Sequence, residues 1–340
     1  MKALIVAPSW IGDTIMAQPL FARLHASHPN LRLDALAPQW VAPVLQRMAD
    51  IEEVVASPFG HGQLSLKTRW RLARELAARS YDAVYVLPNS LKSALVPFMA
   101  GIPRRIGFTG ESRFGLINIR HDIDKVALPL MVERFAQLAE PPGAQLPRPI
   151  SHPKIRSTAA DQERTLSELG LERPQRIAGL CPGAEYGPAK RWPAAHFADL
   201  ASKLDLPVLL MGSAKEFALC DEIAAPVNAA HAGKCLNLAG KTSLAHAFCA
   251  IAGARSVVSN DSGLMHVAAA FGVRQVAIFG SSSPLHTPPL NAAATVLWLK
   301  DDASYQPTLD CAPCFERNCP LGHTRCLVDV QAARVLTALS

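Results

Sequence analysis

Short apolar, β-branched runs alternate with segments of helical periodicity along the whole chain. The strands expected in the first half lie at 2–7, 31–37, 53–56 and 83–87, and the helices at 14–28, 65–79 and 91–100. In the second half the expected strands are 176–181, 207–211, 256–259, 275–279 and 295–299, and the helices are 194–204, 216–224, 244–252, 263–270 and 329–339. Strands that alternate with helices form parallel sheets covered by helices. The pattern therefore predicts an α/β protein.

A proline-rich, polar stretch interrupts this alternation near residue 150. It contains Pro141, Pro142, Pro147, Pro149 and Pro153. Proline lacks a backbone N–H and has a fixed φ, so neither a helix nor a strand continues through such a stretch. The length of 340 residues also exceeds what one hydrophobic core usually serves. We predict an N-terminal domain at 1–150, a C-terminal domain at 151–327, and a last helix at 328–340 that packs back on the N-terminal domain.

The charge balance favours an anionic partner. The chain has 34 Lys and Arg against 28 Asp and Glu, a net charge of +6, which suits an anionic substrate or an anionic membrane surface. The basic residues are not concentrated on one helix or arm, so we expect no nucleic-acid partner. The longest apolar stretch, 83–102, contains a lysine and two prolines, and we therefore expect a cytoplasmic protein without a membrane span.

Asp13 is the first candidate for chemistry. Neither a dinucleotide fingerprint nor a P-loop occurs in the chain, which argues against hydride transfer and ATP hydrolysis. Instead, a turn with Gly12 and Asp13 follows the first expected strand. Asp13 is a candidate general base. The alternative is a capping role at the start of the following helix.

A second candidate segment follows the first strand of the second half. It combines Gly183 and Gly187 with Lys190 and Arg191, just before an expected helix. Glycines let a backbone approach a ligand closely, and the two cations favour an anion. The segment is interpreted as an anion cradle, with a solvated glycine-rich turn as the alternative.

The strongest signal is the string NDSGLMH at 260–266, where a buried strand turns into an apolar helix. The backbone N–H groups of Ser262, Gly263 and Leu264 are placed to bind a diphosphate at the helix N-terminus. Asp261 would repel phosphate, so it contacts sugar hydroxyls in one interpretation and caps the helix in the other. His266, one turn further on, is more typical of a packed histidine than of a ligand.

Two weaker signals concern a nucleotide and an anionic partner. Glu216 is placed to accept both hydroxyls of a ribose, or to act as an acid in the first turn of a helix. Basic residues of the first half suit an acceptor that bears phosphate or carboxylate groups. Those selected are Lys92, Arg105, Arg113 and Arg120. The alternative is a solvated basic face.

Four cysteines gather near the end of the chain, with His323 among them. They are Cys311, Cys314, Cys319 and Cys326. Their density suits a zinc or iron–sulfur site, but their spacing is not that of a standard zinc module. The alternatives are a reduced loop and a disulfide. We expect a structural loop with an optional metal ion and no catalytic part.

Four strings together resemble one family. They are PSWIGD at 8–13, LPNSLKSALVP at 87–97, CPGAEYGPAKRWP at 181–193 and NDSGLMHVAAA at 260–270. In this order they resemble the lipopolysaccharide heptosyltransferases of glycosyltransferase family 9, specifically the heptosyltransferase II group, from the start of the chain to about residue 289. The resemblance implies a GT-B fold, with two Rossmann-like doubly wound domains facing across a cleft. It also implies transfer of heptose from ADP-heptose to the first heptose of the lipopolysaccharide inner core, at the cytoplasmic face of the inner membrane, without a cofactor.

The resemblance also implies roles for individual residues. Asp13 resembles the catalytic base, Lys190 the cation that neutralises the diphosphate, and Asp261 the carboxylate that contacts heptose. The remaining positions of the donor site are Ser262, Gly263, Leu264 and His266 at the diphosphate, Glu216 at the ribose and Thr242 near the adenine. We expect an inverting single displacement that requires no metal ion. The alternatives are a family member with a different acceptor, a nucleotide-sugar epimerase of the same fold, and a metal-binding interaction protein.

Overall fold

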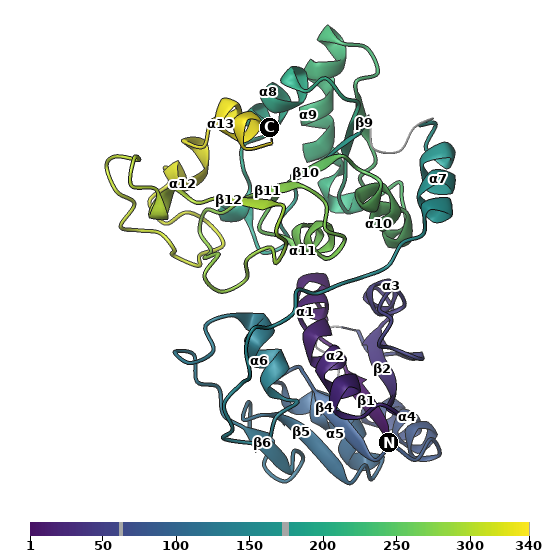
Figure 1. Ribbon diagram of the computed structural model, residues 1–340. Helices are drawn as coiled ribbons and strands as arrows, with labels where there is room; N and C mark the ends of the chain where they lie inside the picture. Colours follow the sequence, from purple (N-terminus) through teal and green to yellow (C-terminus); the bar gives the residue numbers. More distant parts are fainter. Residues whose placement is uncertain (61–63, 172–176, 340) are drawn as a thin grey trace. The chain divides into compact units, whose positions relative to one another are not determined.

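The computed structural model describes residues 1–60, 64–171 and 177–339. The chain forms two compact units, Met1–Arg156 and Ser157–Ser340. Each unit holds one sheet of six parallel strands, and Figure 1 shows helices on both faces of each sheet. Within the described ranges, no helix has both the length and the apolar character needed to cross a membrane.

The sheet of the first unit has the strand order β3-β2-β1-β4-β5-β6. Its strands are β1 (Lys2–Val6), β2 (Arg32–Pro38), β3 (Val54–Ser57), β4 (Ala83–Val86), β5 (Arg104–Phe108) and β6 (Ile119–His121). The first four agree with the predicted strands to within one or two residues. Strands β5 and β6 were not predicted, because β5 begins with two arginines and β6 is only three residues long.

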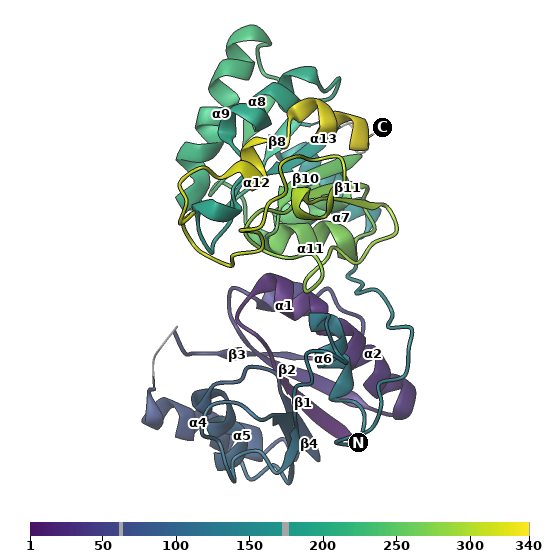
Figure 2. The same ribbon diagram turned by 90° about the vertical axis from the view of Figure 1, so that its left-hand side faces the viewer.

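Helices cover both faces of this sheet. They are α1 (Ile11–Met16), α2 (Gln18–Ser27), α3 (Ala42–Leu45), α4 (Leu66–Ala77), α5 (Leu91–Met99) and α6 (Met131–Gln137). Figure 2 shows α4 and α5 on one side of the strands, and α2 and α6 on the other. The predicted helix 14–28 is wrong as one element: it is two helices, because Pro19 has no N–H to donate to the preceding turn.

The sheet of the second unit has the order β12-β11-β10-β7-β8-β9. Its strands are β7 (Ala178–Cys181), β8 (Val208–Leu210), β9 (Cys235–Asn237), β10 (Ser256–Asn260), β11 (Gln275–Ile278) and β12 (Ala294–Leu297). The expected start of the first of them, Arg176, lies outside the described residues. The three-residue strand β9 was not predicted.

The helices of this unit also lie on two faces. They are α7 (Ala159–Glu168), α8 (Ala194–Lys203), α9 (Phe217–Ala230), α10 (Leu244–Ala252), α11 (Gly263–Ala270), α12 (Arg325–Val328) and α13 (Ala332–Leu339), with short 3-10 helices η1 (Pro188–Lys190), η2 (Ala214–Glu216) and η3 (Leu299–Asp301). Helix α13 packs on α8 and β11 through buried residues such as Val335. Its apolar side is therefore used within the second unit, where the sequence analysis had suggested packing on the N-terminal domain.

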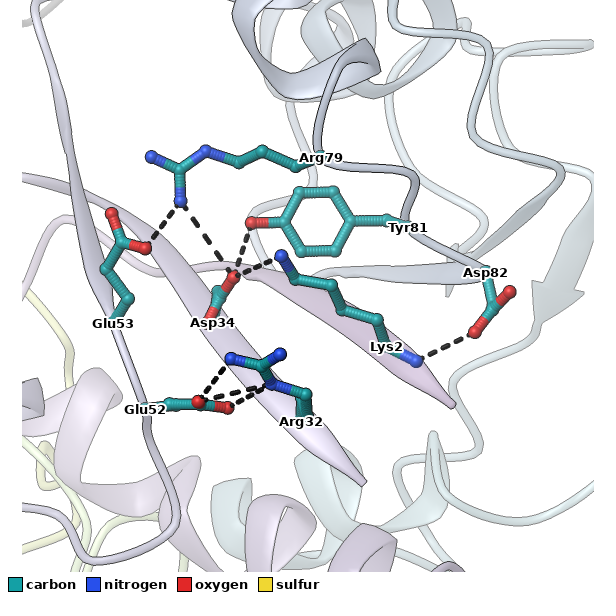
Figure 3. Close-up of polar contacts among 8 residues, drawn as sticks. All are labelled: Lys2, Arg32, Asp34, Glu52, Glu53, Arg79, Tyr81 and Asp82. Atoms are coloured by element: carbon teal, nitrogen blue, oxygen red, sulfur yellow. Dashed lines mark hydrogen bonds and ion pairs between the residues drawn. The ribbon is translucent and has the colours of Figure 1, made fainter. Parts of the chain in front are cut away.

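A buried carboxylate organises the amino-terminal edge of the first sheet (Figure 3). Asp34 on β2 accepts a hydrogen bond of 2.7 Å from the hydroxyl of Tyr81, and the ammonium of Lys2 lies 3.5 Å from the same oxygen. The guanidinium of Arg79 lies 4.0 Å from it and 2.7 Å from Glu53. Burial, reinforced by Asp34, raises the pKa of Tyr81. The hydroxyl therefore stays protonated and donates to the carboxylate.

We expect Tyr81→Phe to lower the free energy of unfolding by about 1–3 kcal/mol, because the variant removes one hydrogen bond to a buried charged acceptor. Urea-induced unfolding followed by circular dichroism measures the change. The matched control is Arg32→Ala, which breaks the exposed pair between Arg32 and Glu52. That variant should leave the urea midpoint unchanged, and equal losses in both variants would contradict the importance of the buried group.

Candidate active site

The centre of the second sheet is a topological switch point. Strands β7 and β10 are neighbours, but the chain continues from β7 to β8 on one side and from β10 to β11 on the other. The loops that follow the two strands therefore diverge and leave room at the carboxyl edge of the sheet, where ligands of such folds bind. The strings at 181–193 and 260–270 meet there.

Asn260, the last residue of β10, ties these two loops together. Its side chain is fully buried. Its oxygen accepts a 2.9 Å hydrogen bond from the backbone N–H of Trp192, and its nitrogen donates a 2.7 Å bond to the carbonyl of Pro182. The sequence analysis did not select Asn260. An asparagine at the end of an apolar strand was the available signal, since a buried amide needs partners.

Lys190 and Asp261 form an ion pair at this edge. The ammonium of Lys190, at the end of η1, lies 2.5 Å from Oδ2 of Asp261. Only 8% of the Asp261 side chain and 20% of the Lys190 side chain are exposed. Helix α11 begins at Gly263 with Ser262 as its N-cap residue, so Asp261 precedes the cap. The helix-capping interpretation of Asp261 is therefore wrong, and the two predicted residues face each other.

The first turn of α11 completes this part of the site. Ser262, Gly263 and Leu264 are half-buried, and the N–H groups of a first helical turn have no acceptor within the helix. His266 is buried one turn further on. Burial lowers the pKa of His266 to about 4, with Asp261 opposing the shift and Lys190 adding to it. The imidazole is therefore neutral near pH 7, which fits the expected packed histidine.

Glu216 lies between two glycine loops. Its Oε2 accepts a 2.7 Å hydrogen bond from the backbone N–H of Ser213 and caps η2. A Cβ atom on Gly183 would lie 1.6 Å from Oε1, and one on Gly212 would lie 2.8 Å from Oε2. Gly183 therefore makes room for this carboxylate, a purpose the sequence analysis did not assign to it. Thr242 is half-buried in the turn before α10.

In the first unit, Asp13 lies in the first turn of α1 and is half-buried. The helix begins at Ile11 with Trp10 as the N-cap residue, so the interpretation of Asp13 as an N-cap is wrong. The loop that leaves β1 leads directly into α1, and β1 neighbours β4 at the switch point of this sheet. Asp13 thus occupies the place in the first sheet that a ligand-binding loop takes in doubly wound folds.

A pocket of about 340 Å³ opens at the carboxyl ends of the strands of the first sheet. Trp40 and Phe59 contribute aromatic walls, and Ser9, Lys92 and Arg69 contribute polar groups. The indole N–H of Trp40 donates to the carbonyl of Ser9, which fixes one wall against the loop of β1. The pocket combines apolar walls with a few polar and cationic groups, the usual composition of a small-molecule site.

The four basic residues predicted to bind the acceptor do not share one pocket: Arg113 and Arg120 line a second, smaller pocket of the first unit. Lys92 lines the larger pocket. Arg113 is buried behind it and donates to the carbonyls of Pro88 and Phe108. Arg105 donates to the carbonyls of Leu116, Ile102 and Gly115, and the guanidinium of Arg120 lies over the ring of Phe114. The guanidinium groups of Arg105 and Arg113 thus bind backbone carbonyls of the first unit. The positive charge of these residues did not reveal this structural role.

Arg69 is a pocket residue that the sequence analysis missed. It is buried, donates to the carbonyls of Leu64 and Lys92, and lies 4.0 Å from the centre of the Phe59 ring. Burial lowers its pKa, although an arginine remains charged at neutral pH. The available signal was its spacing, because Arg69 lies three, four and seven positions before the buried Leu72, Ala73 and Leu76 of α4 and therefore on the same helix face.

The four C-terminal cysteines are reduced and line one small cavity together with His323. Burial tends to raise the pKa of Cys319, but hydrogen bonds from the backbone at 321–324 lower it overall. In the described parts of the chain, no three His, Cys, Asp or Glu side chains are arranged to hold one metal ion. A metal ion at these thiols therefore stays a prediction from the sequence.

Comparison with known proteins decides the family. The family model described as "Glycosyltransferase family 9 (heptosyltransferase)" matches residues 69–324. Lipopolysaccharide heptosyltransferase 2 of Escherichia coli is 42% identical over all of this chain and 98% of its own length. The chain belongs to glycosyltransferase family 9. Lipooligosaccharide heptosyltransferase 2 of Haemophilus influenzae is 43% identical and covers 88% of this chain and 89% of its own.

A solved structure agrees with this assignment. The structure of E. coli ADP-heptose lps heptosyltransferase II has a TM-score of 0.88 and 40% identity, covering 100% of this chain and 97% of that one. The resemblance found in the sequence is therefore confirmed, and so is the α/β fold class, a GT-B fold with two Rossmann-like units. The family member described here is a glycosyltransferase.

We expect His266 to make this glycosyltransferase less stable in acid. Between about pH 6.5 and 4 the unfolded chain binds a proton at this residue, whereas the folded protein does not until the pH reaches about 4. Stability should therefore fall by about 3 kcal/mol as the pH drops through this window. Urea midpoints measured from pH 7 to 4 test this.

His266→Gln should flatten that pH dependence, because it removes the titrating group. His231→Gln, at an exposed histidine, serves as the control and should keep the wild-type slope. An unchanged slope in the His266 variant would contradict the buried, neutral imidazole.

Proposed function

We propose that the protein transfers L-glycero-D-manno-heptose from ADP-heptose to the first heptose of the lipopolysaccharide inner core. Its relatives support the substrates: those at 42–43% identity are named heptosyltransferase 2, and the similar solved structure is an ADP-heptose lps heptosyltransferase II. The observation that carries the proposal is the pair of Lys190 and Asp261 beside the start of α11. A cation, a carboxylate and free N–H groups are what a sugar diphosphate requires.

In the free enzyme the Asp261 carboxylate neutralises Lys190. The donor diphosphate competes for the same ammonium and also accepts hydrogen bonds from the first turn of α11. Asp261 is then available to accept hydrogen bonds from the heptose hydroxyls. Glu216 contacts the ribose and Thr242 lies near the adenine in this proposal. Because Ser213 and the two glycine loops already hold Glu216, its free oxygen is fixed before the nucleotide arrives.

Asp13 acts as the general base in an inverting single displacement. It removes the proton from the attacking hydroxyl of the acceptor. That oxygen bonds to the anomeric carbon as the bond from this carbon to the diphosphate breaks, and ADP leaves from the opposite face. Negative charge develops on the leaving diphosphate, where Lys190 and the dipole of α11 stabilise it. The step as written uses no metal ion and no cofactor.

The pocket of the first unit receives the acceptor. Lys92 supplies positive charge, and Trp40 supplies a face on which a sugar ring packs. Arg69 adds its charge at the wall of the pocket, where two backbone carbonyls and the Phe59 ring hold its guanidinium in place. This arrangement supports an acceptor that carries phosphate or carboxylate groups. Arg105, Arg113 and Arg120 support or flank this region in the proposal, because carbonyls or a ring already contact their guanidinium groups.

Helix α4 is our candidate contact with an anionic membrane surface, on the cytoplasmic side of the inner membrane where such acceptors are anchored. Its outer side exposes Lys67, Trp70, Arg71 and Arg74. The guanidinium of Arg74 lies 5.1 Å from the centre of the Trp70 ring. A helix side with tryptophan and several cations suits the boundary between lipid headgroups and acyl chains.

Incubation with ADP-heptose and defined truncated lipopolysaccharides, with products scored by mass, tests the function. We expect a gain of one heptose only on acceptors that already carry one heptose. A product on an acceptor without heptose would assign a different acceptor within the family. Conversion of the donor alone, with no acceptor present, would support the epimerase alternative and contradict the proposal.

We expect Asp13→Asn to lower kcat by about 10²–10⁴-fold, because the variant cannot take up the acceptor proton. Its affinity for ADP, measured by calorimetry, should stay at the wild-type value. Asp82→Asn, whose carboxylate contacts the backbone N–H of Lys2 in the first unit, is the control and should keep normal turnover. Near-normal turnover of the Asp13 variant would remove the residue from the role of base.

A further inference from the structure

The cysteine-rich segment, residues 309–326, is built into the core of the second unit. Leu309 and Ala312 are buried in the same hydrophobic cluster as Trp192. The cavity that the four thiols line is also lined by Ala189, from the loop after β7, and by Ser281, from the loop after β11. The segment thus joins two loops at the carboxyl edge of the sheet.

Its tip makes hydrogen bonds with the loop after β11 and with the loop that carries Lys190. The backbone N–H of Phe315 donates to the carbonyl of Ser281 at 2.7 Å. The hydroxyl of Tyr186 donates to the carbonyl of Phe315 at 2.8 Å, and the N–H of Ala189 donates to the carbonyl of Arg317 at 3.1 Å. The loop is therefore held from outside at two points, on either side of Gly187.

Gly187 is required by this contact. A Cβ atom at this position would lie 2.4 Å from the carbonyl oxygen of Arg317. The φ of Gly187 is 163°, an extended value that other residues adopt, so the backbone conformation does not demand glycine. Glycine is needed because the main chain of the cysteine-rich segment comes so close to this position.

Tyr186 links the segment to the ammonium of Lys190. The ammonium lies 5.5 Å from the centre of the Tyr186 ring, and the guanidinium of Arg317 lies 5.5 Å from the same centre. Both distances fall within the range of cation–π attraction. The ring is itself fixed by the hydrogen bond of its hydroxyl to Phe315, so its position depends on the segment.

We propose that the cysteine-rich segment positions the donor-binding cation: Phe315 and Arg317 hold Tyr186, Gly187 and Ala189, and Tyr186 sets where the ammonium of Lys190 lies. This inference rests on the proposed function, in which Lys190 binds the diphosphate of a nucleoside diphosphate sugar. Tyr186 is a positioning residue, because it acts through Lys190. The segment thereby gains a role in substrate binding although none of its own side chains need touch the donor.

A double-mutant cycle tests this, with ADP as the probe and its dissociation constant measured by calorimetry. Tyr186→Phe removes one hydrogen bond and keeps the ring, and we expect ADP affinity to fall about 2–10-fold. Lys190→Ala should lower the affinity for ADP by a larger factor. In the Lys190→Ala background, the added Tyr186→Phe change should have no further effect.

Two further variants complete the experiment. Gly187→Ala should weaken ADP binding more than Tyr186→Phe, because the added methyl group displaces the main chain of Arg317. Glu316→Ala changes an exposed side chain of the same segment and should leave ADP affinity unchanged. Tyr186→Phe removes only a hydroxyl group and should fold normally. It therefore tests the proposal even if the Gly187 variant fails to fold.

The outcomes separate the two proposals. If Lys190→Ala weakens ADP binding but Tyr186→Phe does not, the positioning role is wrong and the donor site stands. If the effects of Tyr186→Phe and Lys190→Ala add fully, Tyr186 acts independently of Lys190 and the positioning role is again wrong. If Lys190→Ala binds ADP normally, the donor site of the proposed function is wrong.

Discussion

The buried side-chain amide of Asn260 is the interaction on which the second unit's site depends. Its oxygen and nitrogen bind the backbone of Trp192 and of Pro182, at the two ends of the loop after β7. Because Asp261 is the next residue, the same amide holds the backbone of this carboxylate beside the loop that carries Lys190. A buried amide with both ends satisfied allows one arrangement of the two loops and penalises others. The ion pair is thus a consequence of a neutral hydrogen-bonded anchor.

Much of the fold was readable from the sequence, for physical reasons that also explain the failures. Strands such as β1 and β10 are buried on both faces, so they read as apolar runs. The strands that were missed lie at or near an edge of their sheets and are short or polar: β6 and β9 are three residues long, and β5 begins with two arginines. Periodicity over three residues carries little information.

The residues of the candidate site also include some that the sequence revealed and some that it did not. Lys190 and Asp261 could be selected because both follow strands, where parallel sheets place their ligands. The contact of Tyr186 with Phe315 could not be predicted, since its partner lies far away in the chain. Arg113 shows that a residue selected for its charge can have a structural role. Its charge suggested a partner in solution, whereas its guanidinium serves backbone carbonyls inside the first unit.

Glu216 and Gly183 constrain each other's evolution. The oxygen of Glu216 occupies the volume that a side chain at position 183 would need, so a residue other than glycine there obliges the carboxylate to move. Such a movement competes with the hydrogen bond by which the backbone N–H of Ser213 holds this carboxylate. Substitutions at the two positions should therefore be coupled, since the size of one residue decides where the other side chain can lie.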